Sequence, residues 1–179
     1  MYKKIGDYGV IGDLQTAALV GLDGSVDWFC YPYVDSPSVF GALLDAQKGG
    51  CFAVRPADPY DAVAFYLEET NVLVTRFRTR MGILQLTDFM PVSFREGTAG
   101  EEGAASHVLY RRLELKSGRM RVEVLFQPRF DYATLETLLT PAHGGVLATA
   151  EGWSMGLTST RDLDAGAPSD RVRCVWDME

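Results

Sequence analysis

The chain contains 179 residues, of which 47% are apolar and 23% are charged, so it can form one globular domain with a substantial core. Its formal net charge is −7 at pH 7, and an acidic surface repels phosphate backbones, which argues against nucleic-acid binding. No apolar run approaches the length of a membrane span, and no apolar stretch typical of a signal peptide follows MYKKIGDYG. We therefore expect a cytoplasmic protein that binds neither nucleic acid nor membrane.

The first predicted element is a β-hairpin that joins residues 16–22 (TAALVGL) to residues 25–31 (SVDWFCY). Asp23-Gly24 between them is typical of a two-residue type I′ turn, which needs a positive φ at both positions. That turn would pair Leu19 with Trp28 and Val20 with Asp27. Both faces of the hairpin are largely apolar, so we expect other parts of the chain to cover both.

Residues 36–50 (SPSVFGALLDAQKGG) follow this hairpin and predict a short helix. Ser36 is a suitable N-cap, Pro37 suits the first turn, and Gly49-Gly50 would end the helix.

A second hairpin is predicted around Met81-Gly82, between residues 71–80 (NVLVTRFRTR) and 83–92 (ILQLTDFMPV). This turn would set Phe77 opposite Leu86 and Asp88 opposite Thr75, with Asp88 on the buried face. A buried carboxylate needs partners, so Asp88 is interpreted either as hydrogen-bonded structure or as part of a site.

A third hairpin is predicted around Ser117-Gly118, after an exposed polar loop at residues 94–105. It would join residues 107–116 (HVLYRRLELK) to 119–128 (RMRVEVLFQP) and pair Leu113 with Val122. Glu114 would then meet Arg121 on the opposite, polar face. Arg111 falls among the apolar positions, so we expect it to extend to solvent or to pair with a buried acid.

The last part of the chain predicts a polar loop at residues 161–170 and a strand at 171–179, with Val172, Cys174 and Trp176 on one face. Many short strands with one or two short helices predict an all-β fold, an antiparallel β-sandwich. Because the chain stops directly after an apolar strand, we expect the sandwich to be truncated at its C-terminal strands.

The three cysteines, Cys30, Cys51 and Cys174, are widely spaced and form no CxxC motif. With only two histidines, the chain lacks the closely spaced ligands of a zinc site, and we expect no metal and no cofactor. We interpret the cysteines as free, buried thiols; a disulfide between Cys30 and Cys51 is the less favoured alternative.

Carboxylates are the most interesting candidates for chemistry, because glycoside hydrolysis uses two of them across the scissile bond. Asp27, Asp35, Asp88 and Asp131 are the plausible members. Nothing in the sequence places any two of them face to face, so we expect no catalytic pair. The aromatic residues around Trp28 are split between two strand faces and favour core packing over a sugar-stacking platform.

Three long blocks of this sequence resemble one known family: residues 5–45 (IGDYG to ALLD), 71–92 (NVLV to FMPV) and 110–133 (YRRLEL to PRFDYA). They are similar, in the same order, to the N-terminal region of bacterial and archaeal glycoside hydrolase family 15 proteins, the glucoamylase, glucodextranase and trehalase-like group. The resemblance implies a supersandwich-like N-terminal domain spanning residues 1–179. In this family a catalytic (α/α)6 barrel follows the sandwich, and that barrel is absent from this chain.

The resemblance also implies a function. The catalytic glutamates of the family belong to the barrel, so the chain alone is expected to be no enzyme and to support folding and packing of its own C-terminal catalytic domain. That domain would hydrolyse α-glucosidic bonds of an α-glucan or trehalose with inversion. The alternative is a carbohydrate-binding β-sandwich module. A homodimer through the exposed barrel-facing surface is a further expectation.

Candidate site residues come from the family pattern LPRFDSPSVF, which reads YPYVDSPSVF at residues 31–40 here. Tyr33 replaces the arginine of the pattern, while Asp35 and Ser36 match it. The resemblance therefore suggests Trp28, Tyr33, Asp35 and Ser36 as substrate- or barrel-facing residues, and no catalytic residue.

Overall fold

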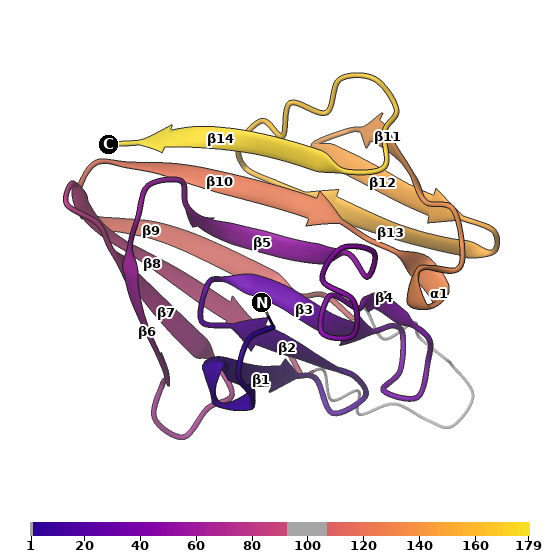
Figure 1. Ribbon diagram of the computed structural model, residues 1–179, viewed down its shortest axis with the longest axis horizontal. Helices are drawn as coiled ribbons and strands as arrows, with labels where there is room; N and C mark the ends of the chain where they lie inside the picture. Colours follow the sequence, from indigo (N-terminus) through magenta and orange to yellow (C-terminus); the bar gives the residue numbers. More distant parts are fainter. Residues whose placement is uncertain (1, 93–106) are drawn as a thin grey trace, which may run out of the picture.

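The computed structural model describes residues 2–92 and 107–179, and the loop predicted at 94–105 lies outside these ranges. The described residues form three antiparallel sheets arranged in two layers (Figure 1). This confirms the prediction of an all-β fold built from antiparallel strands. In the described part of the chain, no helix is long and apolar enough to cross a membrane.

The large sheet forms one layer. Its strands are β1 (Tyr8–Gly12), β2 (Ala17–Gly21), β3 (Ser25–Cys30), β4 (Ser38–Phe40), β5 (Cys51–Pro56), β10 (Met120–Gln127) and β14 (Val172–Met178). They follow the order β1-β2-β3-β5-β10-β14, with β4 paired to β3. The C-terminal strand β14 pairs with β10, as expected of a strand at residues 171–179, and the segment before it is a loop as predicted.

Two smaller sheets form the second layer. One contains, in order, β6 (Asp61–Tyr66), β7 (Leu73–Arg78), β8 (Gly82–Phe89) and β9 (Tyr110–Gly118). The other contains β11 (Leu138–Ala142), β12 (Gly145–Ala150) and β13 (Trp153–Thr158). Both lie against the same face of the large sheet, because residues of β9 and β13 line one cleft together with Phe52 of β5 and Phe126 of β10. Figure 1 shows how the two smaller sheets are arranged along the large one.

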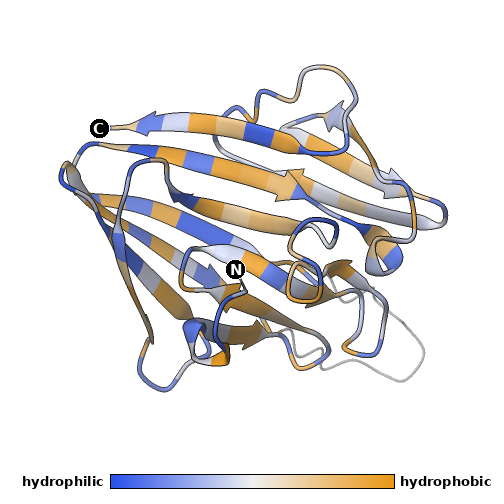
Figure 2. Cartoon of the chain, viewed as in Figure 1, coloured by the Kyte–Doolittle hydropathy of each residue, from blue (hydrophilic) through white to orange (hydrophobic). Residues whose placement is uncertain are grey.

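The core lies between the layers and follows from the two-residue period of each strand. Along β10, Val122, Val124 and Phe126 are buried, and the residues that alternate with them are more exposed and mostly polar (Figure 2). Phe126 packs edge to face against Phe52 of β5, with ring centroids 5.4 Å apart. Residues of all three sheets belong to one hydrophobic cluster.

The turn of the first hairpin differs from the prediction. Only Gly24 has a positive φ, 77°, and its N–H donates to the Gly21 carbonyl at 2.8 Å. Leu22 and Asp23 are therefore the central residues of the turn, and Gly24 follows them in the left-handed region. This is the three-residue loop that ends in a glycine bulge rather than a type I′ turn.

The longer turn changes part of the register. Leu19 pairs with Trp28 as predicted, but a bulge after Leu19 pairs Val20 with Val26 instead of Asp27. The bulge releases Asp27 from the ladder, and its carboxylate accepts a hydrogen bond from Tyr8 Oη at 2.8 Å. Every residue of β3 except Trp28 is buried, so the hairpin is covered on both faces as expected.

The second hairpin forms with a register two residues from the predicted one. Asp88 lies opposite Leu73 rather than Thr75, and Phe77 lies opposite Leu84 rather than Leu86. The Thr79 N–H donates to the Gly82 carbonyl at 3.0 Å, so the turn is centred one residue earlier than Met81-Gly82. A shift of two residues keeps every side chain on its predicted face, and Asp88 is fully buried.

The third predicted hairpin is wrong. Strand β9 pairs with β8, whereas β10 pairs with β5 and β14, so the connection at Gly118 crosses between layers. Leu113 of β9 and Val122 of β10 face the same core from opposite layers. The alternation of apolar residues in the two strands is therefore the same as it would be in a hairpin. The predicted Glu114–Arg121 pair does not form; Glu114 contacts its strand neighbours Arg112 and Lys116 instead.

The helix predicted at residues 36–50 is also wrong. Residues Ser38–Phe40 are strand β4, and the rest of the segment is a series of turns. All of β4 is buried, so its apolar residues are used for pairing and packing rather than for a helix face. The side chain of Asp45 accepts the N–H groups of Gln47 and Lys48 in the turn that follows.

In the part of the chain that the structure describes, helical structure is restricted to two short elements, η1 (Ile5–Asp7) and α1 (Phe130–Ala133). Within α1 the φ angles of Asp131, Tyr132 and Ala133 are 52°, 55° and 64°. This element is therefore a left-handed turn, a conformation that costs about 1–2 kcal/mol per non-glycine residue.

Gly24 lies where a side chain cannot fit, and its replacement by alanine is expected to destabilise the protein. A Cβ at Gly24 would lie 2.3 Å from the Val54 carbonyl oxygen, while a Cβ at Gly144, which has a similar positive φ of 73°, would meet nothing within 4 Å. Gly144→Ala should cost about 1 kcal/mol from backbone strain alone, and Gly24→Ala clearly more. Urea unfolding of both variants measures the difference, and equal losses would contradict the close approach.

Candidate functional site

The predicted residues Tyr33, Asp35 and Ser36 lie together in one surface turn between β3 and β4. The Ser36 N–H donates to the Tyr33 carbonyl at 3.0 Å, and the Tyr33 N–H donates to Ser36 Oγ at 3.1 Å. Tyr33 and Asp35 are exposed. Ser36 therefore closes a turn instead of capping a helix, and the turn leaves Tyr33 and Asp35 exposed.

Trp28 lies elsewhere, on β3, and is only partly exposed. Its ring packs at 6.3 Å, centroid to centroid, against Tyr132 of the left-handed turn α1. Tyr132 is 51% exposed. The structure thus divides the four predicted residues between two places: a Trp28–Tyr132 pair and the turn at residues 33–36.

A histidine–aspartate pair that the sequence did not predict lies beside this turn. His107 Nδ1 lies 2.6 Å from Asp13 Oδ2, and both side chains are more than nine-tenths buried. The rings of Tyr31 and Tyr33 each pack edge-on against the His107 imidazole, with centroids 5.8 Å apart. Asp13 and His107 are 94 residues apart in the chain, so no local motif could have revealed the pair.

The Asp13 carboxylate also holds the loop between β1 and β2. Its Oδ1 accepts the N–H groups of Gln15 and Thr16 at 3.0 and 2.9 Å. Burial alone would raise the pKa of Asp13, but the Thr16 amide and His107 outweigh burial and hold the pKa below its usual value.

This lowered pKa gives a pH prediction. A carboxyl whose pKa is lower in the folded state adds stability above its unfolded pKa of 3.8, and that stability is lost as pH falls through the folded value. Asp13→Asn should therefore lower the free energy of unfolding by about 1–2 kcal/mol near pH 6, and the deficit should shrink below about pH 4. Asp35→Asn, at an exposed carboxylate, is the control. A deficit for Asp13→Asn that does not change with pH would contradict the assignment.

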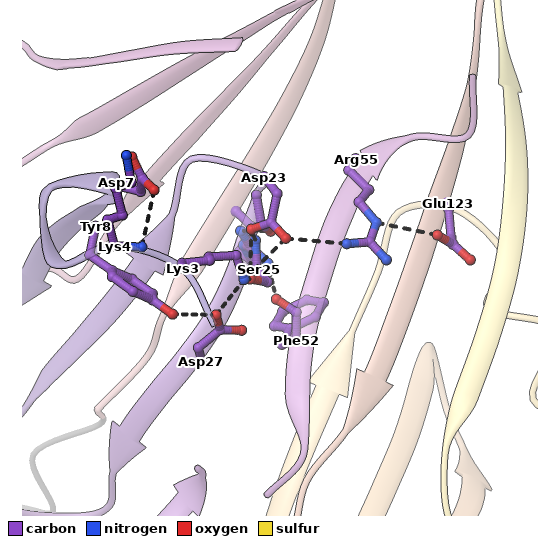
Figure 3. A network of polar contacts seen from close by, with 12 residues as sticks. Lys3, Lys4, Asp7, Tyr8, Asp23, Ser25, Asp27, Phe52, Arg55 and Glu123 are labelled. Carbon is purple, nitrogen blue, oxygen red and sulfur yellow. Dashed lines mark hydrogen bonds and ion pairs between the residues drawn. The ribbon is translucent and has the colours of Figure 1, made fainter. Parts of the chain in front are cut away.

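A connected network of charged side chains covers part of the outer face of the large sheet (Figure 3). Lys3 Nζ lies 2.5 Å from Asp27 Oδ2 and 3.1 Å from Asp23 Oδ2. Arg55 then links Asp23 to Glu123, with both nitrogen–oxygen distances at 3.3 Å. A further cation, Arg173, lies 2.6 Å from Glu123 and closes the network at β14.

The charges in this network neutralise one another. Burial would raise the pKa of Asp23 and of Glu123, but Lys3 beside the first and Arg173 beside the second hold both values below the usual range. A general acid at neutral pH needs the opposite, a raised carboxyl pKa. We therefore interpret the network as structural: it fastens the N-terminal segment onto the sheet.

Asp88, the buried carboxylate of the second hairpin, pairs with Arg111. Arg111 Nε lies 2.9 Å from Asp88 Oδ1, and the two side chains are 4% and 0% exposed. Arg111 also donates to the carbonyls of Phe52 and Gly24, which belong to the opposite layer. Its guanidinium lies over the Phe52 ring, 4.7 Å from the centroid. Of the two interpretations of Asp88, hydrogen-bonded structure is the one the contacts support.

The four carboxylates considered for catalysis therefore lie in four different surroundings. Asp27 pairs with Lys3, Asp88 pairs with Arg111, and Asp131 accepts a hydrogen bond from Thr134 Oγ1 at 2.6 Å. Asp35 lies exposed in its turn. The structure brings none of the four into contact with another within residues 2–92 and 107–179.

In the described ranges, no group of three or more His, Cys, Asp or Glu residues is placed to hold a metal ion. Cys30, Cys51 and Cys174 are free, as predicted, and two of them are buried. Burial raises the pKa of Cys51 to about 11, so its thiol is protonated at neutral pH.

A cleft of about 820 Å³ opens between β9 and β13, over the large sheet. Its floor is apolar and includes Phe52, Val124, Phe126 and Trp176. Polar groups lie along its rim, among them Arg112 and Arg161. The cleft thus continues the core of the sandwich to the surface.

Together these features define a class of protein: a two-layered antiparallel β-sandwich whose buried carboxylates are paired with cations or with hydrogen-bond donors. The family model described as trehalase-like, N-terminal, matches residues 2–160. The chain therefore belongs to the family of trehalase-like N-terminal domains, which confirms the resemblance to the N-terminal region of glycoside hydrolase family 15 enzymes.

Several curated relatives carry the name trehalase. The chain is 37% identical over 175 residues to the trehalase of Thermoplasma volcanium and 38% identical over 165 residues to that of Thermoplasma acidophilum. These matches cover 96% and 90% of this chain but only 27% of each relative. Trehalase 1 of Sulfolobus acidocaldarius is 42% identical over 84 residues, which are 47% of this chain and 15% of the relative. No solved structure gives a significant match.

Proposed function

We propose that this chain is the non-catalytic N-terminal β-sandwich of a trehalase-type glycoside hydrolase, and that it supports the folding and packing of a catalytic domain. One observation carries the proposal: the match covers 96% of this chain but only 27% of the Thermoplasma volcanium trehalase. Most of that relative has no counterpart in these 179 residues. The family description assigns the matched part to the N-terminal region.

The chemistry would then belong to the other part of the enzyme. As expected for glycoside hydrolase family 15, an (α/α)6 barrel would supply the general acid and general base for inverting hydrolysis of an α-glucosidic bond. The relatives named trehalase favour trehalose over an α-glucan as the substrate.

The site geometry supports a structural role for this chain. Asp27 and Asp88 are each neutralised by a cation, which suits a scaffold and not an acid–base pair. The exposed residues Tyr33 and Asp35 are held in one turn, and the Tyr33 ring packs against His107, which pairs with Asp13. We include this turn in the proposal as part of the surface that faces the barrel. A cytoplasmic location, supported by the three free thiols, is also part of the proposal.

Glucose release by the purified chain tests the proposal. With trehalose, maltose and maltooligosaccharides as substrates, the chain alone should release no glucose above a buffer blank. Release that scales with chain concentration, and that Asp27→Asn or Asp35→Asn abolishes, would overturn the non-catalytic role.

Calorimetric titration with the same sugars separates the scaffold from the alternative, a carbohydrate-binding module. The exposed aromatic residues belong to different elements, including the turn at Tyr33, β6 at Tyr66, β9 at Tyr110 and α1 at Tyr132. A row of such rings is the usual platform for sugar stacking, so we expect no binding at millimolar sugar. Saturable binding that is lost in Tyr132→Ala would favour the binding module.

A further inference from the structure

The second layer of the sandwich is divided between two sheets, and the cleft lies where they face each other. Strand β9 pairs with β8 on one side, and β13 pairs with β12 on one side. Within residues 2–92 and 107–179, neither strand has a partner on its other edge. Both edges border the cleft, which is lined by residues 107–113 and 154–161. Unpaired edges of this kind are templates for another strand.

The floor of the cleft has the character of a core and not of a surface. Val124 and Phe126 are 1% and 2% exposed, yet both line the cleft with Phe52 and Trp176. Phe52, Phe126 and Phe40 pack against one another as an aromatic cluster. A cover that completes this core must present apolar side chains to the floor and polar side chains to solvent, which is the alternation of a β-strand.

The end of β14 lies at the correct place to supply such a strand. Met178 lies opposite Met120 at the start of β10, directly after the turn at Gly118 that ends β9. Met178 also lines the cleft. Polypeptide that continued beyond β14 would therefore start near the C-terminal end of β9. A segment that ran from there along β9 would be antiparallel to it and would reach residues 110–113, the part of β9 that lines the cleft.

We propose that the cleft is a strand-acceptor site, filled in the complete enzyme by an extended segment of the polypeptide that follows this sandwich. The inference rests on the proposed function, because the segment belongs to the longer enzyme. The Thermoplasma relatives supply such polypeptide, since this chain spans 27% of their length. The segment would need about eight residues to match β9, with apolar side chains at alternate positions.

Trp176 provides a reporter for the test. The chain has three tryptophans, and Trp28→Phe with Trp153→Phe leaves Trp176 on the cleft floor as the only one. The probe is a synthetic peptide with the 30 residues that directly follow the matched segment in Thermoplasma volcanium trehalase. Its control is a scrambled peptide of the same composition. The native-sequence peptide should shift Trp176 emission to shorter wavelength and reduce its quenching by acrylamide.

Hydrogen exchange locates the added strand. The peptide should slow exchange of β9 amides between Tyr110 and Leu115 at least tenfold, since they would gain partners. Amides of β6 (Asp61–Tyr66), the opposite edge of the same sheet, should not change. Equal protection of β6 and β9, or no protection of either, would overturn the proposal.

Two substitutions on the sheet that borders the cleft provide a matched pair. Leu157 of β13 lines the cleft, whereas Leu147 of β12 is 39% exposed and does not. Leu157→Glu should abolish the response to the peptide, and Leu147→Glu should retain it. If Leu157→Glu fails to fold, hydrogen exchange of the unsubstituted chain with the peptide still tests whether a strand is added to β9.

Other occupants of the cleft give different results. Protection of β9 that rises with chain concentration in the absence of peptide, together with a dimer in sedimentation, would assign the cleft to a second copy. Protection by millimolar trehalose would assign it to sugar. Either result would contradict the strand-acceptor proposal while the absence of glucose release still supported the non-catalytic role.

Discussion

Replacing Arg111 by methionine should lower the free energy of unfolding by about 3–5 kcal/mol, the usual cost of leaving one member of a buried ion pair alone. The Asp88 carboxylate is fully buried and would lose its cation. The carbonyls of Phe52 and Gly24 would lose their donors as well. Because these contacts join β8 and β9 to β5 and to the turn between β2 and β3, the substitution should weaken the packing of one layer on the other.

Urea unfolding followed by circular dichroism measures this loss, with Arg112→Met as the control. The Arg112 side chain is 68% exposed and contacts Glu114, so its loss should cost about 0–1 kcal/mol. The double variant Asp88→Leu with Arg111→Met should be more stable than Arg111→Met alone, because no unpaired charge remains. Equal stability of the Arg111→Met and Arg112→Met variants would contradict the role assigned to this pair.

Replacing Phe77 by alanine is expected to have an effect of similar size, about 3–5 kcal/mol. Phe77 is completely buried on β7, and its ring packs edge to face against Tyr60 at 5.1 Å between centroids. It also lies beneath the turn at Gly24, where an added Cβ would come within 3.0 Å of its ring. The surrounding backbone can relax only partly, so a cavity would remain.

Phe65→Ala on the neighbouring strand β6 is the matched control, since Phe65 is 38% exposed and stacks on Arg76. Its loss should cost about 1 kcal/mol or less. Thermal and urea unfolding of both variants give the comparison. A Phe77→Ala variant as stable as Phe65→Ala would show that the core does not depend on this ring.

The sequence predicted the strands β2, β3, β7, β8, β9, β10 and β14 and the faces that they bury, because alternation reports burial directly. It did not predict β1, β5, β6 or the sheet of β11, β12 and β13. It placed Asp88 and Arg111 among apolar positions, and both proved to be buried and paired with each other. It also predicted β14 and the loop before it. These features depend on neighbouring residues, so the local pattern was sufficient.

The failed predictions involve pairing between strands. Alternation in β9 and β10 is satisfied equally by a hairpin and by two layers that face the same core, so it could not exclude the crossing at Gly118. The helix predicted after Ser36 fails because Val39 and Phe40 are used by the buried strand β4. Turn chemistry indicated a connection at Asp23-Gly24 but not the bulge that changed its register.

Less of the candidate site than of the fold could be predicted from the sequence. Tyr33, Asp35 and Ser36 are neighbours in the chain, so their grouping in one turn follows from proximity. The partners that surround them, Asp13 and His107, come from distant segments. The network that holds Asp27 likewise joins residues from the N-terminus to β14. Without known contacts between strands, no spacing rule identifies such groups.

The trehalase activity of the Thermoplasma volcanium enzyme provides a direct test of the supporting role proposed for this domain. Three proteins are compared: the intact enzyme, the enzyme without its matched N-terminal segment, and a chimera in which this chain replaces that segment. We expect that the shortened enzyme loses soluble expression and trehalose hydrolysis, and that the chimera recovers both. The chimera with Arg111→Met should inactivate at a lower temperature than the unsubstituted chimera. A shortened enzyme that is as active and heat-stable as the intact one would contradict the supporting role of this domain.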